Sequence, residues 1–385
     1  MELLGKSKEE LRAFCAELGE PAYRGGQVYH ALYAERKFDF ARMTNLPSAL
    51  RERLAKEARI TLPEVEQRFA SADGSVRYLL GLGTEKEKEF DAEGAEKSQG
   101  KKEQGTAKPV FVEAVFMPSE ERQTICISTQ AGCAVDCHFC LTAQLGLIRN
   151  LTAGEIVAQV LLPLEEHKAD VAPRFEAQGK QTNVVLMGQG EPLLNFEPVM
   201  TALRILLDPE GIGLSPRHVT LSTSGIVPGI EGLVQEKVRP KLAISLNASN
   251  DGQRDALMPI NRKYPLGALL EACKNYPLRP WEHLTFEYVM LGGVNDAADD
   301  ARRVARLLAP LKRVKVNLIP WNPGELPYRE PAAENLEEFR RTLHDKGIPA
   351  FVRYSRGRDV MAACGQLALL QIQGAPLSAG VQRGA

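Results

Sequence analysis

The sequence predicts an α/β protein, built as a partial, open TIM-like β/α barrel that follows a small helical domain and a short β extension. Three observations lead to this prediction. From residue 122 onward, short apolar segments alternate with amphipathic helical segments, a pattern typical of parallel strands joined by right-handed crossovers. Residues 1–62 have helical periodicity instead, and residues 63–121 contain strand-like runs. With six or seven strands, the barrel need not close.

The first 121 residues carry the signals of the helical domain and the β extension. The segment SKEELRAFCAEL opens with a Ser-x-x-Glu capping box, and LPSALRERLAKEA has apolar residues at helical spacing. The strand-like runs are VEQRFA, VRYLLGL and PVFVEAVFM, with the turn sequence SADGS after the first. Residues 85–108, rich in Lys, Glu and Gly, predict a disordered surface loop.

The barrel prediction covers residues 122–370 and is followed by an expected flexible tail at 371–385. The strand candidates are TICIST, TNVVLMG, HVTLSTS, KLAISLNA, LTFEYVML, VKVNLIP and AFVRYS. The helix candidates are TAGEIVAQVLLPLEEHK, FEPVMTALRILLD, LGALLEACKNY, DDARRVARLLAPL and AENLEEFRRTLHDKG. Catalytic groups of such barrels gather at the carboxyl ends of the strands.

Three cysteines, Cys133, Cys137 and Cys140, lie within eight residues directly after the first barrel strand. Three thiolates on a four-iron cluster leave one iron free for a further ligand, so this spacing favours an iron–sulfur centre. A zinc site would need a fourth ligand, for which His138 is the nearby candidate. A third interpretation treats these cysteines as small buried hydrophobic residues, although three of only seven cysteines lie here.

Composition excludes some classes of protein. The net charge is −1, hydrophobic residues make up 44% of the 385 residues, and no apolar run approaches the length of a membrane span. The charged N-terminus and the clustered, odd-numbered cysteines predict a protein of the reducing cytoplasm. Basic residues do form two local runs, one from Arg302 to Lys315 and one from Arg353 to Arg358. Charge alone favours solvated surface for both.

Polar or glycine-bearing motifs follow five of the predicted strands. Besides the cysteines, these are Gly190-Glu191, Ser222, Ser245-Leu246-Asn247 and Asn322. Each of them could be an ordinary turn. Because they recur at the same end of successive parallel strands, together they predict one cofactor-binding face.

The Cys-x3-Cys-x2-Cys spacing resembles that of the radical S-adenosylmethionine enzymes. The stretches TICISTQAGCAVDCHFC, MGQGEPLLN, VTLSTSGIVP, LIPWNP and RGRDVMAACGQL are similar to those of the RlmN/Cfr family of RNA methyltransferases. The resemblance implies a radical S-adenosylmethionine barrel that binds a [4Fe-4S] cluster through the three cysteines. It also implies S-adenosylmethionine binding at the five strand-end motifs, with Gly190-Glu191 facing the methionine amine.

The same resemblance implies roles for three further residues. Cys364 is expected to accept a methyl group as an S-methylcysteine intermediate, Cys126 to resolve a covalent RNA–enzyme adduct, and Glu113 to accept a proton. The implied reaction is methylation at C2 of an adenosine in 23S ribosomal RNA, in the peptidyl transferase centre, and in transfer RNA near the anticodon. The implied partners are these RNAs, contacted in part by the N-terminal helices, and a flavodoxin- or ferredoxin-type electron donor; we expect a monomer.

Alternatives remain open at this point. Cfr-like methylation at C8 is one, and a non-catalytic iron–sulfur module for RNA binding or redox sensing is another. Judged by residue type alone, Cys364 and Cys126 could be packing cysteines and Glu113 a solvent-side strand residue. Asn247 departs from the His that the family pattern leads us to expect, and Asn cannot titrate.

Overall fold

The computed structural model describes residues 1–83, 109–171 and 180–367. The predicted loop at 85–108 and the predicted tail at 371–385 lie outside the described residues. In the described parts, ten strands form one sheet in the order β1-β2-β3-β4-β7-β8-β9-β10-β11-β12, and a separate two-stranded sheet joins β5 (Gln130–Gly132) to β6 (Leu147–Asn150). None of the described helices is long and apolar enough to span a lipid bilayer.

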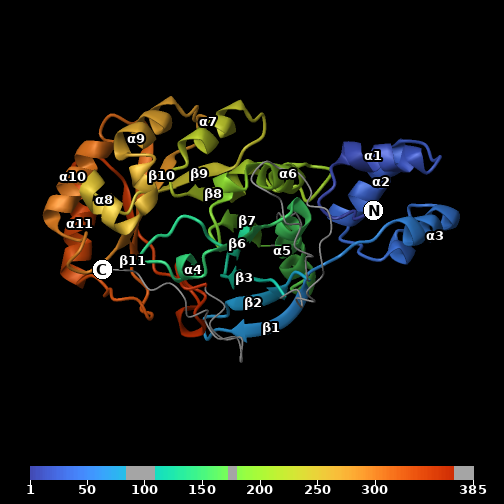
Figure 1. Ribbon diagram of the computed structural model, residues 1–385, viewed down its shortest axis with the longest axis horizontal. Helices are drawn as coiled ribbons and strands as arrows, with labels where there is room; N and C mark the ends of the chain where they lie inside the picture. Colours follow the sequence, from blue (N-terminus) through green and yellow to red (C-terminus); the bar gives the residue numbers. More distant parts are fainter. Residues whose placement is uncertain (84–108, 172–179, 368–385) are drawn as a thin grey trace, which may run out of the picture.

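The N-terminal helices form a lobe on one side of the barrel (Figure 1). They are α1 (Lys8–Glu17), α2 (Tyr23–Tyr33) and α3 (Ser48–Glu57). The predicted capping box is confirmed: the Ser7 hydroxyl accepts the Glu10 N–H and the Glu10 carboxylate accepts the Ser7 N–H.

The lobe and the barrel share one hydrophobic core, because buried residues of both belong to the same contact cluster. The backbones of the two are in close contact at Gly5 and Gly154. A Cβ on Gly5, whose φ is +88°, would lie 2.3 Å from the backbone nitrogen of Gly154. Only glycine permits this approach.

The β extension starts the large sheet with antiparallel strands. These are β1 (Glu64–Ala70), β2 (Val76–Gly81) and β3 (Phe111–Pro118), and β3 pairs with β4 (Arg122–Cys126), the first barrel strand. The turn between β1 and β2 contains Asp73-Gly74, as predicted.

Seven parallel strands form the predicted open barrel (Figure 1). After β4 come β7 (Gln181–Leu186), β8 (Val219–Thr223), β9 (Lys241–Ser245), β10 (Leu284–Met290), β11 (Val314–Pro320) and β12 (Ala350–Val352). The helices between them are α5 (Ala153–Glu166), α6 (Phe196–Leu207), α7 (Val227–Gln235), α8 (Asp251–Leu257), α9 (Leu266–Asn275), α10 (Ala298–Leu308) and α11 (Ala333–Asp345). The barrel is open because β1 and β12 are the two edges of one sheet.

The two faces of the barrel sheet differ in burial. Along β7, β8 and the first half of β11, buried side chains alternate with partly buried ones, whereas the last three residues of β11 are all buried. The buried set, including Val184, Leu221 and Val316, belongs to the main core. The partly buried set, including Asn183, Thr220 and Asn317, faces the barrel interior. The interior face is therefore reached by solvent along the strands.

Several elements were not predicted individually. These are α2, α4 (Leu141–Gln144), α7, α8 and the β5–β6 pair. In α7 the sequence contains Pro228, Gly229 and Gly232, which weaken helix propensity. The two glycines are accommodated because they pack closely on Leu193 and Phe196. Tertiary packing thus overrides the local preference.

Candidate functional site

A pocket lies at the carboxyl ends of the barrel strands, where the sequence predicted a cofactor-binding face. It encloses about 960 Å³ of empty space, its open mouth included, which suits a ligand of cofactor size. Its lining includes Cys133, Cys137, Cys140, Gly190, Glu191, Ser222, Ser245, Asn247 and Cys364. Nine predicted site residues, widely separated in sequence, therefore meet in one cavity.

The three clustered cysteines lie on the loop between β5 and α4. This loop is held at its ends: the Cys133 N–H donates to the Gly146 carbonyl at 2.9 Å, and the Leu141 N–H donates to the Gly365 carbonyl at 2.8 Å. Gly132, with φ +73°, allows a turn in which a Cβ would collide with the Gly146 oxygen. The second of these bonds joins the cysteine loop directly to the segment that carries Cys364.

The thiols of this loop are poised for a cationic ligand. Burial is the largest cause that raises the pKa of all three, with Cys133 reaching about 12. An iron centre would supply the positive charge needed to hold them as thiolates. The three thiols, the buried Glu191 carboxylate and the small hydroxyls around them fit a [4Fe-4S] cluster with S-adenosylmethionine.

No group of three or more His, Cys, Asp or Glu side chains in residues 1–83, 109–171 and 180–367 is arranged to hold a single metal ion. A cuboidal cluster does not require such convergence, since each cysteine binds a different iron. His138 contacts Asp136, with 3.9 Å between Nε2 and Oδ2.

The Gly190-Glu191 motif follows β7. A Cβ on Gly190, whose φ is +98°, would lie 2.7 Å from the Gln130 backbone nitrogen, so this close approach requires glycine. The Glu191 carboxylate is almost fully buried and accepts the Leu193 N–H at 3.0 Å and the Ser224 N–H at 2.6 Å. Burial raises its pKa, although these hydrogen bonds act in the opposite direction. A carboxylate fixed in this way could bind an ammonium group.

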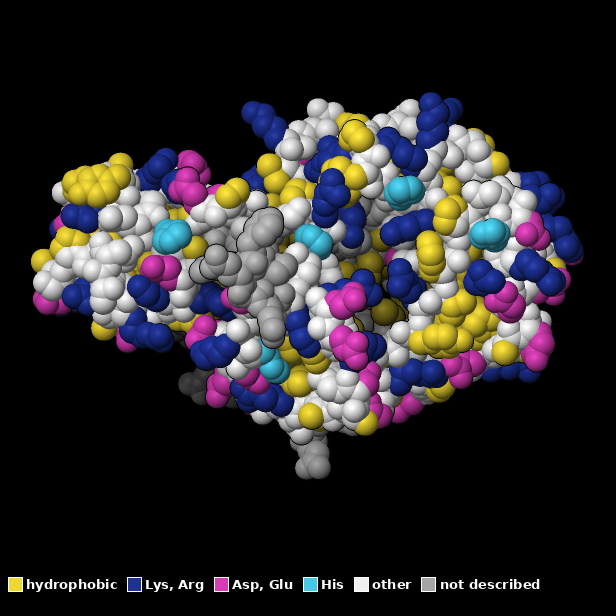
Figure 2. All heavy atoms as spheres, turned by 180° about the vertical axis from the view of Figure 1, so that it is seen from behind, with side chains coloured by type: hydrophobic (Ala, Val, Ile, Leu, Met, Phe, Trp, Pro, Cys, Tyr) yellow, Lys and Arg dark blue, Asp and Glu magenta, His cyan; other side chains and the backbone are white. Residues whose placement is uncertain are grey.

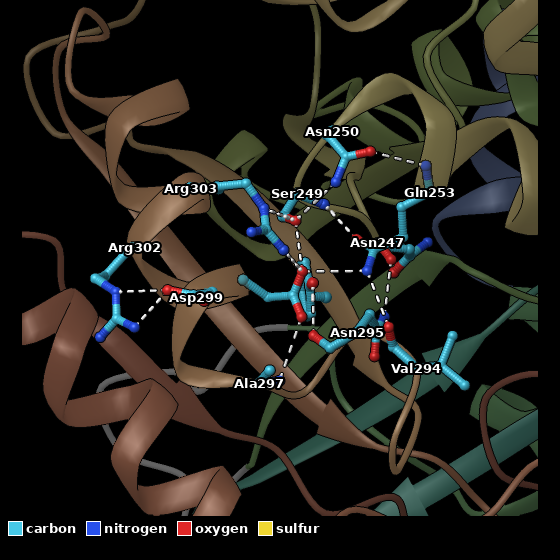
Figure 3. A network of polar contacts seen from close by, with 12 residues as sticks. Asn247, Ser249, Asn250, Gln253, Val294, Asn295, Ala297, Asp299, Arg302 and Arg303 are labelled. Carbon is cyan, nitrogen blue, oxygen red and sulfur yellow. Dashed lines mark hydrogen bonds and ion pairs between the residues drawn. The ribbon is translucent and has the colours of Figure 1, made fainter.

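Asn247 follows the end of β9 by two residues and has the left-handed conformation, with φ +54°. Its Oδ1 accepts the Val289 N–H at 2.8 Å, and its carbonyl accepts Asn295 Nδ2 at 2.8 Å (Figure 3). Asn295 also bonds to Val289 and Leu291, on and beside β10 (Leu284–Met290). Asn is among the residues that tolerate this backbone conformation. Asn247 therefore joins the ends of β9 and β10 as well as lining the pocket.

Two of the predicted cofactor residues do not point into the pocket. The Leu246 side chain is fully buried in the main core. Asn322 donates through Nδ2 to the Cys364 carbonyl at 3.1 Å and to Ser355 Oγ at 2.9 Å. Asn322 thus holds the Cys364 segment.

Residues 353–367 carry Cys364, and the β extension clamps them. Asp73, in the β1–β2 turn, accepts the Gly357 N–H at 2.9 Å and the Ser75 N–H at 2.8 Å. Asp359 reaches back to the same turn, accepting the Ser71 hydroxyl at 2.5 Å and the Ala72 N–H at 2.9 Å. The two aspartates form a reciprocal clamp between the extension and the cysteine-bearing segment.

Cys364 is exposed to solvent and lines the pocket. The surrounding protein and the nearby Glu287 raise its pKa to about 11, while a hydrogen bond with Ser355 lowers it. Glu287, which the sequence analysis missed, lines the pocket from β10 and accepts Asn317 Nδ2 at 2.9 Å. Burial raises its pKa as well. It occupies a strand interior, so no turn motif marked it.

Cys126, the last residue of β4, lies in an apolar cluster with Val115, Ala362 and Leu367. Its pKa is raised, first by burial and then by the proximity of Cys364. The structure thus brings together two cysteines that are far apart in sequence.

Glu113 is fully buried on β3. It forms an ion pair with Arg77, which is also buried, and its Oε2 accepts Gln189 Nε2 at 3.3 Å. The guanidinium supplies the counter-charge that a buried carboxylate requires. Glu113 does not line the pocket, but by strand alternation it shares the interior face with Val115, a neighbour of Cys126. The solvent-side alternative for Glu113 is wrong, because its side chain is fully buried. Nothing in the sequence indicated that Arg77 would be its ion-pair partner.

Arg254 of α8 was also not predicted from the sequence. Its side chain is fully buried. It donates to the carbonyls of Ser224, Ser245 and Leu246. The ends of β8 and β9 are therefore fixed by one side chain.

Comparisons with known proteins match this architecture over nearly the whole chain. Residues 1–60 match the ribosomal RNA large subunit methyltransferase N-terminal domain, and residues 127–308 match the radical SAM superfamily. A probable dual-specificity RNA methyltransferase RlmN from Koribacter versatilis is 48% identical, covering 91% of this chain and 96% of the relative. An RlmN from Anaeromyxobacter sp. is 45% identical, covering 94% and 88%.

A solved structure is similar as well. The crystal structure of a radical SAM methyltransferase from Sphaerobacter thermophilus superposes with a TM-score of 0.81 at 40% identity, and the match covers 95% of this chain and 99% of that one.

Proposed function

Because the chain belongs to the RlmN family of radical S-adenosylmethionine RNA methyltransferases, we propose that it methylates C2 of an adenosine in 23S ribosomal RNA and in transfer RNA. The observation that carries this proposal is the arrangement of five cysteines. Three line a pocket with Glu191, and Cys364 in the same pocket lies close to Cys126. This arrangement combines a cluster site with a pair of thiols.

In this proposal Cys133, Cys137 and Cys140 hold the cluster, and Glu191 binds the methionine amine of S-adenosylmethionine. Ser222, Ser245 and Asn247 complete the cofactor contacts from the neighbouring strand ends. When bound, the cluster and S-adenosylmethionine supply methyl groups and a hydrogen-abstracting radical. The electron for this chemistry comes from a flavodoxin- or ferredoxin-type donor.

Cys364 acts as the methyl carrier. Its sulfur loses the thiol proton and takes the methyl group of S-adenosylmethionine, leaving S-adenosylhomocysteine. A radical from a second S-adenosylmethionine would remove a hydrogen atom from the methyl group, and the methyl carbon would then bond to C2 of adenine. The adduct would lose one electron to the iron–sulfur cluster and the C2 proton, and the RNA would remain covalently attached to Cys364. Glu113 accepts the proton lost from C2. This route reaches a carbon that is not nucleophilic.

Cys126 then releases the product. Its thiolate attacks the Cys364 sulfur, so that an S–S bond forms as the S–C bond to the RNA breaks, and the departing carbon takes up a proton. The nearness of Cys364 to Cys126, whose apolar cluster contains Ala362 and Leu367 on either side of Cys364 in sequence, supports this step. We further propose that the protein acts as a monomer and that helices α1–α3 bind RNA.

The test is nucleoside analysis of 23S ribosomal RNA and transfer RNA incubated with the reconstituted enzyme, reductant and S-adenosylmethionine. We expect 2-methyladenosine. Detection of 8-methyladenosine would replace the C2 assignment, and the absence of any methylated adenosine would overturn the proposal. In a Cys126→Ala variant the covalent RNA–protein adduct should accumulate, and recovery of free protein alone would argue against the two-thiol route.

A further inference from the structure

Three basic residues lie on the interior face of the barrel sheet, at the amino ends of their strands. Arg122 is the first residue of β4, Lys241 the first of β9 and Lys315 the second of β11. Side chains alternate along a strand. Lys241 therefore faces the same side as Ser245, and Lys315 the same side as Ile319, both of which line the pocket.

These three residues, here called the amino-end cations, have no carboxylate partner within hydrogen-bonding distance among residues 1–83, 109–171 and 180–367. In the parts of the chain that the structure describes, none of them takes part in an ion pair. The nearest acidic residues are engaged elsewhere, Glu282 with Arg279 at 3.6 Å and Glu287 with Asn317. Arg302 and Arg303 of the first basic run do have carboxylate partners, Asp299 and Asp300 (Figure 3).

The amino-end cations also act on one another. Burial lowers the pKa of Lys241, and the charges of Lys315 and Arg122 lower it further, although Glu282 raises it. Burial likewise lowers the pKa of Lys315, with Arg353 adding to the shift and Glu287 opposing it. Like charges gathered without carboxylate partners destabilise a fold, and a bound anion relieves their repulsion.

Interior-face side chains of differing burial lie between these cations and the pocket, and Ala243, between Lys241 and Ser245 on β9, is fully buried. Side chains of intermediate burial, Thr124, Asn183, Thr220 and Asn317, lie between them on the interior face. Lys241 and Ser245 are four residues apart on one strand, which corresponds to roughly 13 Å. Figure 2 shows Lys and Arg side chains gathered around a hollow in the middle of one face of the molecule. The positions of intermediate burial on the interior face are thus partly open to solvent.

Aromatic side chains border the same region. Phe351, 46% exposed, is paired in register with Asn317, and Arg353 lies over its ring at 5.7 Å. The guanidinium carbon of Arg217 lies over the Trp281 ring, 4.7 Å from its centroid. Cations interspersed with exposed aromatic rings are typical of surfaces that bind single-stranded nucleic acid, through phosphates and stacked bases.

We propose that Arg122, Lys241 and Lys315 bind backbone phosphates of the substrate RNA at the amino ends of the barrel strands. This inference rests on the proposed function, because it takes RNA as the substrate. It adds a site outside the cofactor pocket and the N-terminal helices. The ligand is a phosphodiester backbone, so these contacts add affinity without reading sequence.

The experiment compares RNA binding of the wild type, Lys241→Ala, Lys315→Ala and the double variant across a salt series, using a hairpin RNA that contains the target adenosine. Lys346→Ala is the matched control, since Lys346 is exposed at the end of α11. Each lost phosphate contact should reduce the slope of log K against log salt by about 0.7. We expect about tenfold weaker binding for the double variant, with KM raised more than kcat is lowered.

Further readouts separate this site from a structural role. Methylation of Cys364 in the absence of RNA should be unchanged in the double variant, and the charge-retaining Lys241→Arg/Lys315→Arg variant should recover the salt slope. A double variant with the wild-type slope and affinity would overturn the inference. Failure of the proposed function would appear differently, as wild-type enzyme that binds RNA with the expected slope but leaves its adenosines unmethylated.

Discussion

The two walls of the pocket are held in different ways. The wall that carries Glu191 and Asn247 is fixed from within the barrel, by strand-end backbone groups and by Arg254. The wall that carries Cys364 is a segment without regular strand or helix around the cysteine, fixed by side chains from elsewhere, such as Asp73 of the extension and Asn322. The barrel therefore builds the proposed cofactor site, and additions to the barrel position the methyl-carrying thiol.

Substitutions of the cysteines should separate the functions of the two walls most clearly. Cys137→Ala should abolish cluster binding, measured by iron content and visible absorbance, and with it every activity. Cys364→Ala should retain iron and bind S-adenosylmethionine but transfer no methyl group to RNA. A Cys364→Ala enzyme that methylates RNA would show that the second wall is not needed.

Removal of Arg77 should have the next largest effect. Arg77→Met leaves the Glu113 carboxylate buried without its ion-pair partner, and we expect the free energy of unfolding to fall by about 3–5 kcal/mol. Urea denaturation measures this. An Arg77→Met/Glu113→Leu double variant should regain most of the loss; if it does not, packing of Arg77 on the Phe69 ring, 4.0 Å from its guanidinium, carries the stability instead.

The thiol of the second wall should make its own methylation depend on pH. The pKa of Cys364 is raised to about 11, so the thiolate is a minor form at neutral pH and grows as pH rises. Its methylation in the absence of RNA should therefore accelerate by up to tenfold per pH unit below about pH 11. Mass spectrometry of the peptide that contains Cys364 follows the rate, and a flat profile between pH 7 and 9 would contradict the prediction.

Loosening the clamp should affect only the second wall. Asp73→Ala removes the acceptor for the Gly357 and Ser75 N–H groups, and we expect methylation of Cys364 to slow by about tenfold, with iron content unchanged. Asp73→Asn keeps an acceptor and should be milder. Glu330→Ala, which breaks the exposed ion pair with Arg358, is the control and should behave as wild type. Equal loss of iron in Asp73→Ala would mean that the clamp supports both walls.

The smallest effect is expected at Asn247. Asn247→His restores the residue expected from the family pattern; His is also enriched in the left-handed conformation, and its ring nitrogen can accept the Val289 N–H. Methylation rates should stay within about threefold of wild type. Asn247→Ala keeps no acceptor and should lower the free energy of unfolding by about 1–3 kcal/mol.

The sequence was sufficient for the barrel because strand and helix periods alternate regularly there and because chemical motifs mark the strand ends. The positions of Glu287 and Arg254 in the site could not be predicted, because these residues lie within a strand and a short helix that carry no recognisable motif. Nor could the sequence reveal the clamp, because Asp73 and Asp359 are ordinary turn residues until the fold brings them together. The basic run ending at Lys315 is uniform in charge, yet Arg302 and Arg303 on α10 pair with acidic residues of the same helix, whereas Lys315 lies on β11 and faces the barrel interior.

The contact between Gly5 and Gly154 limits how the helical lobe could be exchanged between related enzymes. A side chain on either glycine would meet backbone of the other segment, since a Cβ on Gly154 would lie 2.5 Å from the Leu4 oxygen. A chimaera that takes its lobe from one relative and its barrel from another would need glycine on both sides of the junction. The lobe and the barrel are thus expected to be inherited as one unit.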